Sequence, residues 1–364
     1  MKITRIRLER KAIELDPPFF AAWDPNPRRS FEAVLVFVET DEGVTGIGSG
    51  DTMDGFERHE HHFVGQRALD LAHHQGILEL LSRQANGGRY WPLEAALWDL
   101  AGKAEGRPVV ELLGGQTGSL PAYASTGTQL PPGERAESAL ALRAEGFGAL
   151  KVRIDRNRID DGLAGVTAVR EAVGDAMEIM VDLNQGWRMP GDDSPPLDRE
   201  SVRSIAQRLQ ELDVLWFEEP LPKDDVEGYA DLRNEFAVRV AGGEMAETIS
   251  ELEAFEAADA LDVYQPDAVL SVGLSRAVEL GRRVIPGGRW FTPHTWTNGI
   301  GLLANLHVVA AAGGGPYVEF PYDPPWWTPE RRDFVLADPI RVQNGYLNVP
   351  DRPGLGFELA DAPV

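Results

Sequence analysis

The sequence predicts an α/β protein built around a parallel (β/α) barrel, and three observations support this prediction. The length of 364 residues suits a barrel of roughly 250 residues with a smaller companion region. From Pro121 onward, short apolar segments alternate regularly with segments of helical periodicity. Seven consecutive apolar segments end in ionisable residues, and the same ends of the strands carry the chemistry in barrels of this kind.

Residues 1–120 lack this alternation and form the predicted companion region, onto which the Gly- and Pro-rich tail at 340–364 is expected to pack. Strand-like segments cover residues 3–10, 33–39 and 44–47. Residues 17–29 contain prolines and aromatic residues and are too apolar for a solvated linker, so we expect a packed loop there. A helical region follows from about residue 54 to 113 and ends at Gly114.

Residues 121–339 form the predicted barrel, in which strands and helices alternate along the chain. The predicted strands are residues 122–125, 149–154, 179–184, 214–219, 238–244, 261–267, 290–294 and 317–320. The helices between them include residues 134–146, 162–173, 199–212 and 275–284.

The seven predicted strands after the first one end in ionisable side chains, although strands buried on both faces are usually rich in Val, Ile and Leu. In chain order these residues are Lys151, Arg153, Asp182, Glu218, Glu219, Glu244, Asp267, His294 and Glu319. Asp182, Glu218 and Glu244 come from neighbouring strands, and convergent carboxylates repel one another unless a cation neutralises them. Since hard oxygen ligands favour Mg²⁺, the sequence predicts a Mg²⁺ site at the mouth of the barrel.

Asp267 and His294 close the next two strands, where a carboxylate can fix the tautomer of a histidine and raise its basicity. We therefore expect His294 to be the catalytic histidine. His307 lies in an apolar run and is predicted to be a packing residue. The remaining histidines lack the spacing of a metal site and are predicted to lie on the surface: His59, His61, His62, His73 and His74.

The formal net charge of −23 argues against nucleic acid as a partner, because an acidic surface repels phosphate backbones. No apolar run is long enough to span a membrane, and the N-terminus does not resemble the apolar core of a signal peptide. We therefore expect a cytoplasmic protein without a membrane partner. The absence of cysteine excludes disulfides and thiolate catalysis.

Several motifs occur in a fixed order along nearly the whole chain. A helical signature spans residues 96–103 and 112–115, and a C-terminal signature spans residues 350–356. Between them lie Lys151-Val152-Arg153, Val181-Asp182-Leu183-Asn184, Phe217-Glu218-Glu219-Pro220, Gly242-Gly243-Glu244, Gln265-Pro266-Asp267, His294 and Glu319. This set resembles the mandelate racemase/muconate lactonizing enzyme family of the enolase superfamily, and in particular its sugar-acid dehydratases.

The resemblance implies a modified (β/α)7β TIM-type barrel without a standard eighth helix, covered by an α+β capping domain made of the N-terminal region and the tail. It also implies a homo-oligomer that abstracts the proton α to a carboxylate and passes through an enediolate, which Mg²⁺ and Lys151 would stabilise. The other implied site residues are the Mg²⁺ ligands Asp182, Glu218 and Glu244, the dyad Asp267–His294, and Glu319 as a hydrogen-bond donor to the substrate carboxylate.

The chain departs from many family members at the second strand, where they carry Lys-x-Lys and it has Lys151-Val152-Arg153. A guanidinium stays protonated at neutral pH, so Arg153 is a poor base but a good anchor for a carboxylate or hydroxyl. A single base, His294, suits β-elimination better than racemisation. We therefore expect a hydro-lyase that converts a sugar acid, an aldonate or an aldarate, to a 2-keto-3-deoxy acid.

The main alternative is an isomerase of the same family, either a cycloisomerase or an epimerase. A non-catalytic sugar-acid-binding barrel would lack a metal ligand or the histidine, and an unrelated metal hydrolase would need histidine ligands near the first strand; the sequence shows neither mark. The substrate-binding candidates are Asn184, Glu219, Trp23, Arg28, Arg29, Asp51 and Trp296.

Overall fold

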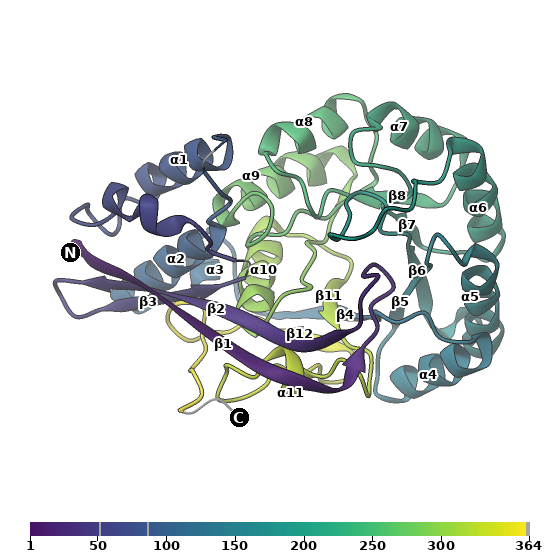
Figure 1. Cartoon of the computed structure of the whole chain (residues 1–364), viewed down its shortest axis with the longest axis horizontal. Coiled ribbons are helices and arrows are strands. Elements are labelled where there is room, and N and C mark those ends of the chain that lie inside the picture. Colours follow the sequence, from purple (N-terminus) through teal and green to yellow (C-terminus); the bar gives the residue numbers. More distant parts are fainter. Residues whose placement is uncertain (51, 86, 362–364) are drawn as a thin grey trace.

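The computed structural model describes residues 1–50, 52–85 and 87–361 and shows an α+β region packed against an α/β barrel (Figure 1). The candidate Asp51 lies outside the described residues. Within them, no helix is both long and apolar enough to cross a membrane.

The N-terminal region is built on a three-stranded antiparallel sheet in the order β1-β2-β3. The strands are β1 (Ile3–Phe19), β2 (Arg28–Thr40) and β3 (Thr45–Ser49), and the helices that follow are α1 (Leu71–Ser82), α2 (Trp91–Glu105) and α3 (Val109–Leu112). Val36 and Val38 of β2 share a buried core with Leu97 of α2. Two short 3-10 helices, Phe56–Arg58 and Glu60–His62, precede α1.

The long hairpin of β1 and β2 corrects the prediction of a loop at residues 17–29. Pairing continues to Phe19 opposite Arg28, so the connection shortens to residues 20–27. A register shift between Glu14 and Phe19 absorbs Pro17, because an edge strand tolerates proline where the ladder is irregular. The hairpin runs from the N-terminal region to the barrel in Figure 1 and so brings its tip to the barrel mouth.

Eight parallel strands, each of the first seven followed by a helix, confirm the predicted (β/α)7β barrel. The strands are β4 (Ser119–Ser125), β5 (Ala149–Arg153), β6 (Glu178–Asp182), β7 (Trp216–Glu218), β8 (Arg239–Gly242), β9 (Val263–Tyr264), β10 (Trp290–Phe291) and β11 (Val318–Pro321). The helices are α4 (Pro132–Ala144), α5 (Ile159–Val173), α6 (Arg199–Glu211), α7 (Val226–Glu235), α8 (Ile249–Ala257), α9 (Leu274–Val284) and α10 (Gly299–Ala312). In the described chain only the short α11 (Pro329–Arg332) follows β11, as the modified barrel requires.

Several strands are shorter than predicted, and this difference helps to build the site. The ladder of β8 ends at Gly242, that of β9 at Tyr264 and that of β10 at Phe291. Glu244, Asp267 and His294 therefore lie two or three residues beyond the last paired residue of their strands. Single backbone hydrogen bonds continue there, such as that from His294 N–H to the Gln265 carbonyl (3.4 Å), but the regular ladder has ended and the side chains turn toward a common centre.

Buried carboxylates of α2 hold the N-terminal region on the barrel. Glu94 accepts hydrogen bonds from the backbone N–H groups of Leu274 (2.9 Å) and Ser275 (3.2 Å), and so caps α9 from another element. Asp99 accepts from Ile47 and from Leu355 of the tail, each at 2.8 Å. The tail also contributes β12 (Tyr346–Asn348), which pairs with β4 of the barrel. The domain limits 1–120, 121–339 and 340–364 remain a prediction.

Besides His294, two of the described histidines are buried, one as expected and one not. His307 is buried, which confirms it as a packing residue. His74 was predicted to lie on the surface, and this prediction is wrong: it is fully buried, packs against Phe63, and has Nε2 2.9 Å from the carbonyl of Arg67. Its position on the inner face of α1 was hidden by the neighbouring polar residues.

The pH dependence of stability is expected to include a contribution from His307. Its Nδ1 accepts from Val110 N–H at 3.1 Å and its Nε2 faces the Leu355 carbonyl at 3.2 Å, so this packing fits only the neutral ring. Burial lowers the pKa of His307 from 6.5 to about 4. The unfolded chain therefore takes up this proton first, and the stabilisation is complete above about pH 6.5 and lost as the pH falls toward 4.

The measurement is the free energy of unfolding of wild type and of His307→Gln, because an amide can make both hydrogen bonds without titrating. The two proteins should diverge by about 3 kcal/mol between about pH 7 and pH 4. His73→Gln, at an exposed position, is the control and should follow wild type. Parallel curves for wild type and His307→Gln would contradict the prediction.

Candidate active site

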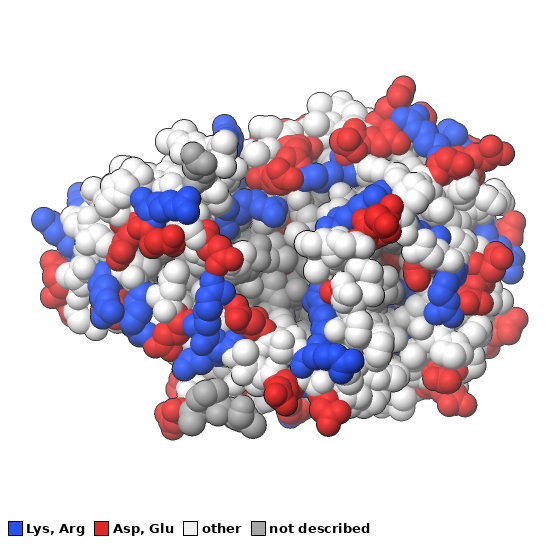
Figure 2. Space-filling model, in the orientation of Figure 1, with Lys and Arg blue, Asp and Glu red and all other residues white. Residues whose placement is uncertain are grey.

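A cavity of about 340 Å³ opens where the hairpin tip meets the barrel mouth. Figure 2 shows a hollow near the middle of this face, with both acidic and basic side chains around it. The N-terminal region lines the cavity with Trp23, Arg28 and Phe31 among others. The barrel lines it with Arg153, Asn184, Glu244, His294 and Trp296 among others, so the cavity reaches the predicted site.

The carboxylates of Asp182, Glu218 and Glu244 converge beneath this cavity. Oxygen atoms of the three lie within 4.8 Å of one another, and no other such group of metal-binding residues occurs among the described residues. All three side chains are buried. Burial raises the pKa of Glu218 and of Glu244, and for Glu218 the charge of Asp182 adds to this effect. The charged triad is therefore costly unless a cation joins it.

Two buried cations from β5 already contact the triad. Lys151 Nζ lies 2.5 Å from Glu218, 2.8 Å from Glu319 and 3.5 Å from Asp182. Burial alone would lower the pKa of Lys151, but the charges of Glu218 and Glu319 outweigh burial and raise it. Arg153 forms an ion pair with Asp182 and a 3.0 Å hydrogen bond to Asn184.

The negative charges around the triad outnumber the positive ones, and a divalent cation would balance them. The carboxylates are those of Asp182, Glu218, Glu244 and Glu319, and the cations are Lys151 and Arg153. Outside the Asp267–His294 pair, this count leaves an excess of two negative charges. The buried oxygen Oε2 of Glu244 also has no hydrogen-bond partner among the described residues. The oxygen donors, the charge excess and this open atom together fit Mg²⁺.

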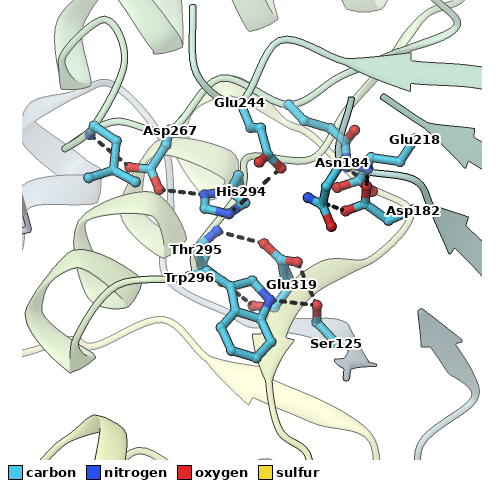
Figure 3. Close-up of polar contacts among 12 residues, drawn as sticks. Ser125, Asp182, Asn184, Glu218, Glu244, Asp267, His294, Thr295, Trp296 and Glu319 are labelled. Carbon is cyan, nitrogen blue, oxygen red and sulfur yellow. Dashed lines mark hydrogen bonds and ion pairs between the residues drawn. The ribbon is translucent and has the colours of Figure 1, made fainter. Parts of the chain in front are cut away.

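Asp267 and His294 form the expected dyad, with His294 Nδ1 2.9 Å from Asp267 Oδ2 (Figure 3). The other oxygen of Asp267 accepts from Asn305 Nδ2 at 3.1 Å and from Val269 N–H at 2.8 Å. These bonds keep the carboxylate in place, so Nδ1 donates to Asp267 and Nε2 is the ring nitrogen left to exchange a proton. Burial lowers the pKa of His294, but Glu244 and Glu319 outweigh it and raise the pKa to about 9.

Glu319 lies on β11 and accepts hydrogen bonds at both oxygens. Oε1 accepts from Ser125 Oγ at 2.7 Å, and Oε2 accepts from Thr295 N–H at 2.6 Å (Figure 3). Burial would raise its pKa, but Lys151 and His294 more than offset this and hold the pKa of Glu319 well below its usual range. Glu319 is therefore an acceptor in this state, and it can donate to a substrate carboxylate only after it gains a proton.

The candidate specificity residues fall into two groups. Asn184, Trp23, Arg28 and Trp296 line the cavity, whereas Glu219 is not among its lining residues. Glu219 is buried behind Gly186, where a Cβ would lie 2.2 Å from its Oε1. Burial and the charge of Glu244 raise the pKa of Glu219 well above its usual value, so its neutral acid form is favoured. Arg29 is also absent from the lining of the cavity.

Several polar residues around the site were not predicted from the sequence. Ser125 accepts from Trp296 Nε1 at 2.8 Å and donates to Glu319, which links the cavity wall to the site. Trp187 donates to Glu244, and Gln265 donates to Glu218. Ser125 and Gln265 do lie at strand ends, which was a usable signal, but their side chains are not ionisable and were passed over.

Comparisons with known proteins agree with this geometry. The family described as "Mandelate racemase / muconate lactonizing enzyme, N-terminal domain" matches residues 6–114, and the family described as "Enolase C-terminal domain-like" matches residues 134–362. An arabinonate dehydratase from Saccharolobus solfataricus is 32% identical over 273 residues, which cover 74% of this chain and 69% of that protein. A D-galactarolactone cycloisomerase from Agrobacterium fabrum is 30% identical over an alignment of 379 positions, gaps included, that covers 99% of this chain and 97% of that protein.

A solved structure extends the agreement to the metal. The crystal structure of an L-talarate dehydratase from Polaromonas sp. JS666, complexed with Mg and L-glucarate, matches with a TM-score of 0.82 at 26% identity and covers 99% of this chain and 95% of that one. The acidic triad of this chain and its barrel fit the same cofactor. The chain therefore belongs to the mandelate racemase/muconate lactonizing enzyme family of the enolase superfamily, and it is a Mg²⁺-dependent enzyme that abstracts the proton α to a carboxylate.

Proposed function

We propose that the enzyme dehydrates a sugar acid, an aldonate or an aldarate, to a 2-keto-3-deoxy acid. The observation that carries this proposal is the single base of the site. His294 lines the cavity and keeps Nε2 free of Asp267. Arg153, at the position of the second lysine of Lys-x-Lys members, is a guanidinium paired with Asp182 and Asn184. Burial would lower the pKa of Arg153, but the charges of Asp182 and Glu218 outweigh burial and raise the pKa above its usual value. A neutral form of Arg153 near pH 7 is therefore excluded.

In the proposed reaction His294 removes the proton α to the carboxylate. A Mg²⁺ ion held by Asp182, Glu218 and Glu244 would supply positive charge next to the substrate carboxylate. Lys151 contributes a positive charge to the same group. Glu319 takes up a proton from solvent as the anionic substrate enters and then shares this proton with the substrate carboxylate. The C3–O bond then breaks, and the imidazolium of His294 gives its proton to the leaving hydroxide to form water. The enol product becomes the 2-keto acid.

The dyad and its neighbours suit both steps. Asp267 fixes the Nδ1–H tautomer and stabilises the imidazolium between the two proton transfers. Nε2 of His294 carries no hydrogen bond to Asp267 and is therefore the ring nitrogen that can take up and release the proton. Asn184, Trp23, Arg28 and Trp296 line the rest of the cavity, where we propose that they contact the hydroxyls or the distal end of the substrate.

The relatives support both this proposal and one alternative. The arabinonate dehydratase and the structure with L-glucarate favour dehydration of a sugar acid. The cycloisomerase matches nearly the full length of this chain, so an isomerisation without loss of water is the second candidate. We further propose, from the resemblance alone, that the enzyme is a homo-oligomer and acts in the cytoplasm.

The test is a screen of aldonic and aldaric acids with Mg²⁺, in which semicarbazide detects the 2-keto acid. We expect one stereochemical group of acids to give product, and EDTA to abolish it. Each acid is also incubated in D₂O and followed by NMR. If a stereochemically complete set of acids shows α-proton exchange or epimerisation but no 2-keto acid, the dehydratase proposal is wrong and the isomerase is favoured.

A further inference from the structure

We propose that Trp187 is a positioning residue that holds Glu244 so that one of its oxygens is left for the metal. Trp187 Nε1 donates to Glu244 Oε1 at 2.6 Å. Oε2 of the same carboxylate is buried and has no hydrogen-bond partner among the described residues. The indole thus occupies one oxygen and leaves the other one open toward the triad.

The conformation of the loop between β6 and α6 positions the indole of Trp187 next to Glu244. Asn184 has a left-handed backbone (φ 46°), and Gly186 packs so closely on Glu219 that a Cβ would lie 2.2 Å from it. Gln185 fastens the loop, because it donates to the Pro220 carbonyl and accepts from Leu197 N–H at 2.7 Å. Trp187 therefore leaves the end of β6 and reaches a carboxylate that follows β8.

Glu244 depends on this contact more than the other two triad residues depend on theirs. Asp182 accepts from Asn184 N–H at 2.8 Å and also contacts Arg153 and Lys151. Glu218 Oε2 accepts from both Trp216 Nε1 (2.9 Å) and Gln265 Nε2 (2.8 Å). For Glu244 the indole of Trp187 is the one hydrogen-bond donor among the described residues.

The catalytic histidine lies close to the other oxygen of Glu244. His294 Nε2 lies 3.7 Å from Glu244 Oε2, beyond hydrogen-bonding distance. Without the Trp187 N–H, the carboxylate gains freedom to rotate toward His294, which removes an oxygen from the metal site. Partners of metal ligands act in this way elsewhere, and their loss typically weakens metal affinity by about 10- to 100-fold.

The test measures metal binding without substrate, so its outcome does not depend on the proposed reaction. Mn²⁺, a paramagnetic substitute for Mg²⁺, is titrated into EDTA-treated, dialysed protein, and the free ion is followed by EPR. In Trp187→Phe, which keeps a ring but loses the N–H, the Kd for Mn²⁺ is expected to rise about tenfold. Trp98→Phe is the matched control, since Trp98 is also partly buried and its Nε1 donates to Ser275 Oγ at 3.2 Å, away from the triad.

Two readouts separate positioning from a general loss of structure. Both variants are expected to keep the circular dichroism and the metal-free Tm of wild type to within a few degrees. An unchanged Kd for Mn²⁺ in Trp187→Phe, or an equal loss in Trp98→Phe, would overturn the proposal.

A measurement on the unsubstituted protein does not depend on the folding of the phenylalanine variant. With isotope-labelled tryptophan, the indole N–H signal of Trp187 is assigned by its absence in Trp187→Phe or in Trp187→Tyr. This signal is expected to move during a Mg²⁺ titration, with the same Kd as the metal. A Trp187 signal that stays in place at saturating Mg²⁺ would contradict the proposal.

Discussion

Replacement of His294 by asparagine is expected to lower kcat by roughly 10²- to 10⁴-fold, the usual contribution of a general acid–base residue. The effect should lie at the upper end of this range, because one imidazole serves both proton transfers of the proposed dehydration. An amide can still occupy the place of the ring and accept or donate a hydrogen bond, but it cannot take up a proton. The measurement is the initial rate of 2-keto acid formation with the acid identified by the screen.

The controls for this prediction separate loss of the base from loss of the site. His294→Asn should bind Mn²⁺ with the affinity of wild type within a few-fold, because the residue is not a triad member. His307→Gln changes another buried histidine, which has a packing role, and should keep the wild-type rate near neutral pH. A rate for His294→Asn within tenfold of wild type, with metal bound, would remove His294 from the proposed mechanism.

The sequence predicted the barrel and the centre of the site because both follow from a repeated geometry. The carboxyl ends of parallel strands meet at one face, so ionisable residues at those ends must converge wherever the strands close into a barrel. This rule alone was enough to predict the grouping of Asp182, Glu218 and Glu244, and the structure brings oxygen atoms of the three within 4.8 Å of one another. Exact strand limits were not needed, since a strand end misplaced by two residues still points to the same face.

The remaining features depend on distances that no local pattern contains. Trp187 contacts Glu244 across an intervening strand, and its place in a loop gave no sign of this partner. Glu219 is adjacent to a triad residue, but its left-handed backbone (φ 43°) turns it behind Gly186 and away from the cavity. Arg153 was predicted to anchor the substrate, and the structure shows in addition that it is paired with Asp182. Each outcome follows from tertiary packing and not from the identity of the residue.

Replacement of Lys151 by methionine is expected to have the largest effect on stability. Lys151 is fully buried and contacts carboxylates on β6, β7 and β11, so its loss leaves several negative charges without a cation. Breaking such a buried pair typically costs about 3–5 kcal/mol, whereas a surface pair contributes about 1 kcal/mol or less. The free energy of unfolding, measured by urea in EDTA, should fall accordingly. Lys223→Met, which removes a partly exposed lysine 2.8 Å from Glu247, is the matched control.

A double variant shows whether this cost arises from charge or from packing. In Lys151→Met/Glu319→Gln one of the unpaired carboxylates is neutral, so part of the lost stability should return, although Glu319→Gln alone is expected to destabilise the protein. Such non-additivity is the mark of two residues in direct contact. Strictly additive losses would mean that Lys151 acts through its volume. The single variant should also lose roughly 10²- to 10³-fold in kcat even with saturating Mg²⁺, because the developing charge on the substrate carboxylate loses one of its two cationic partners.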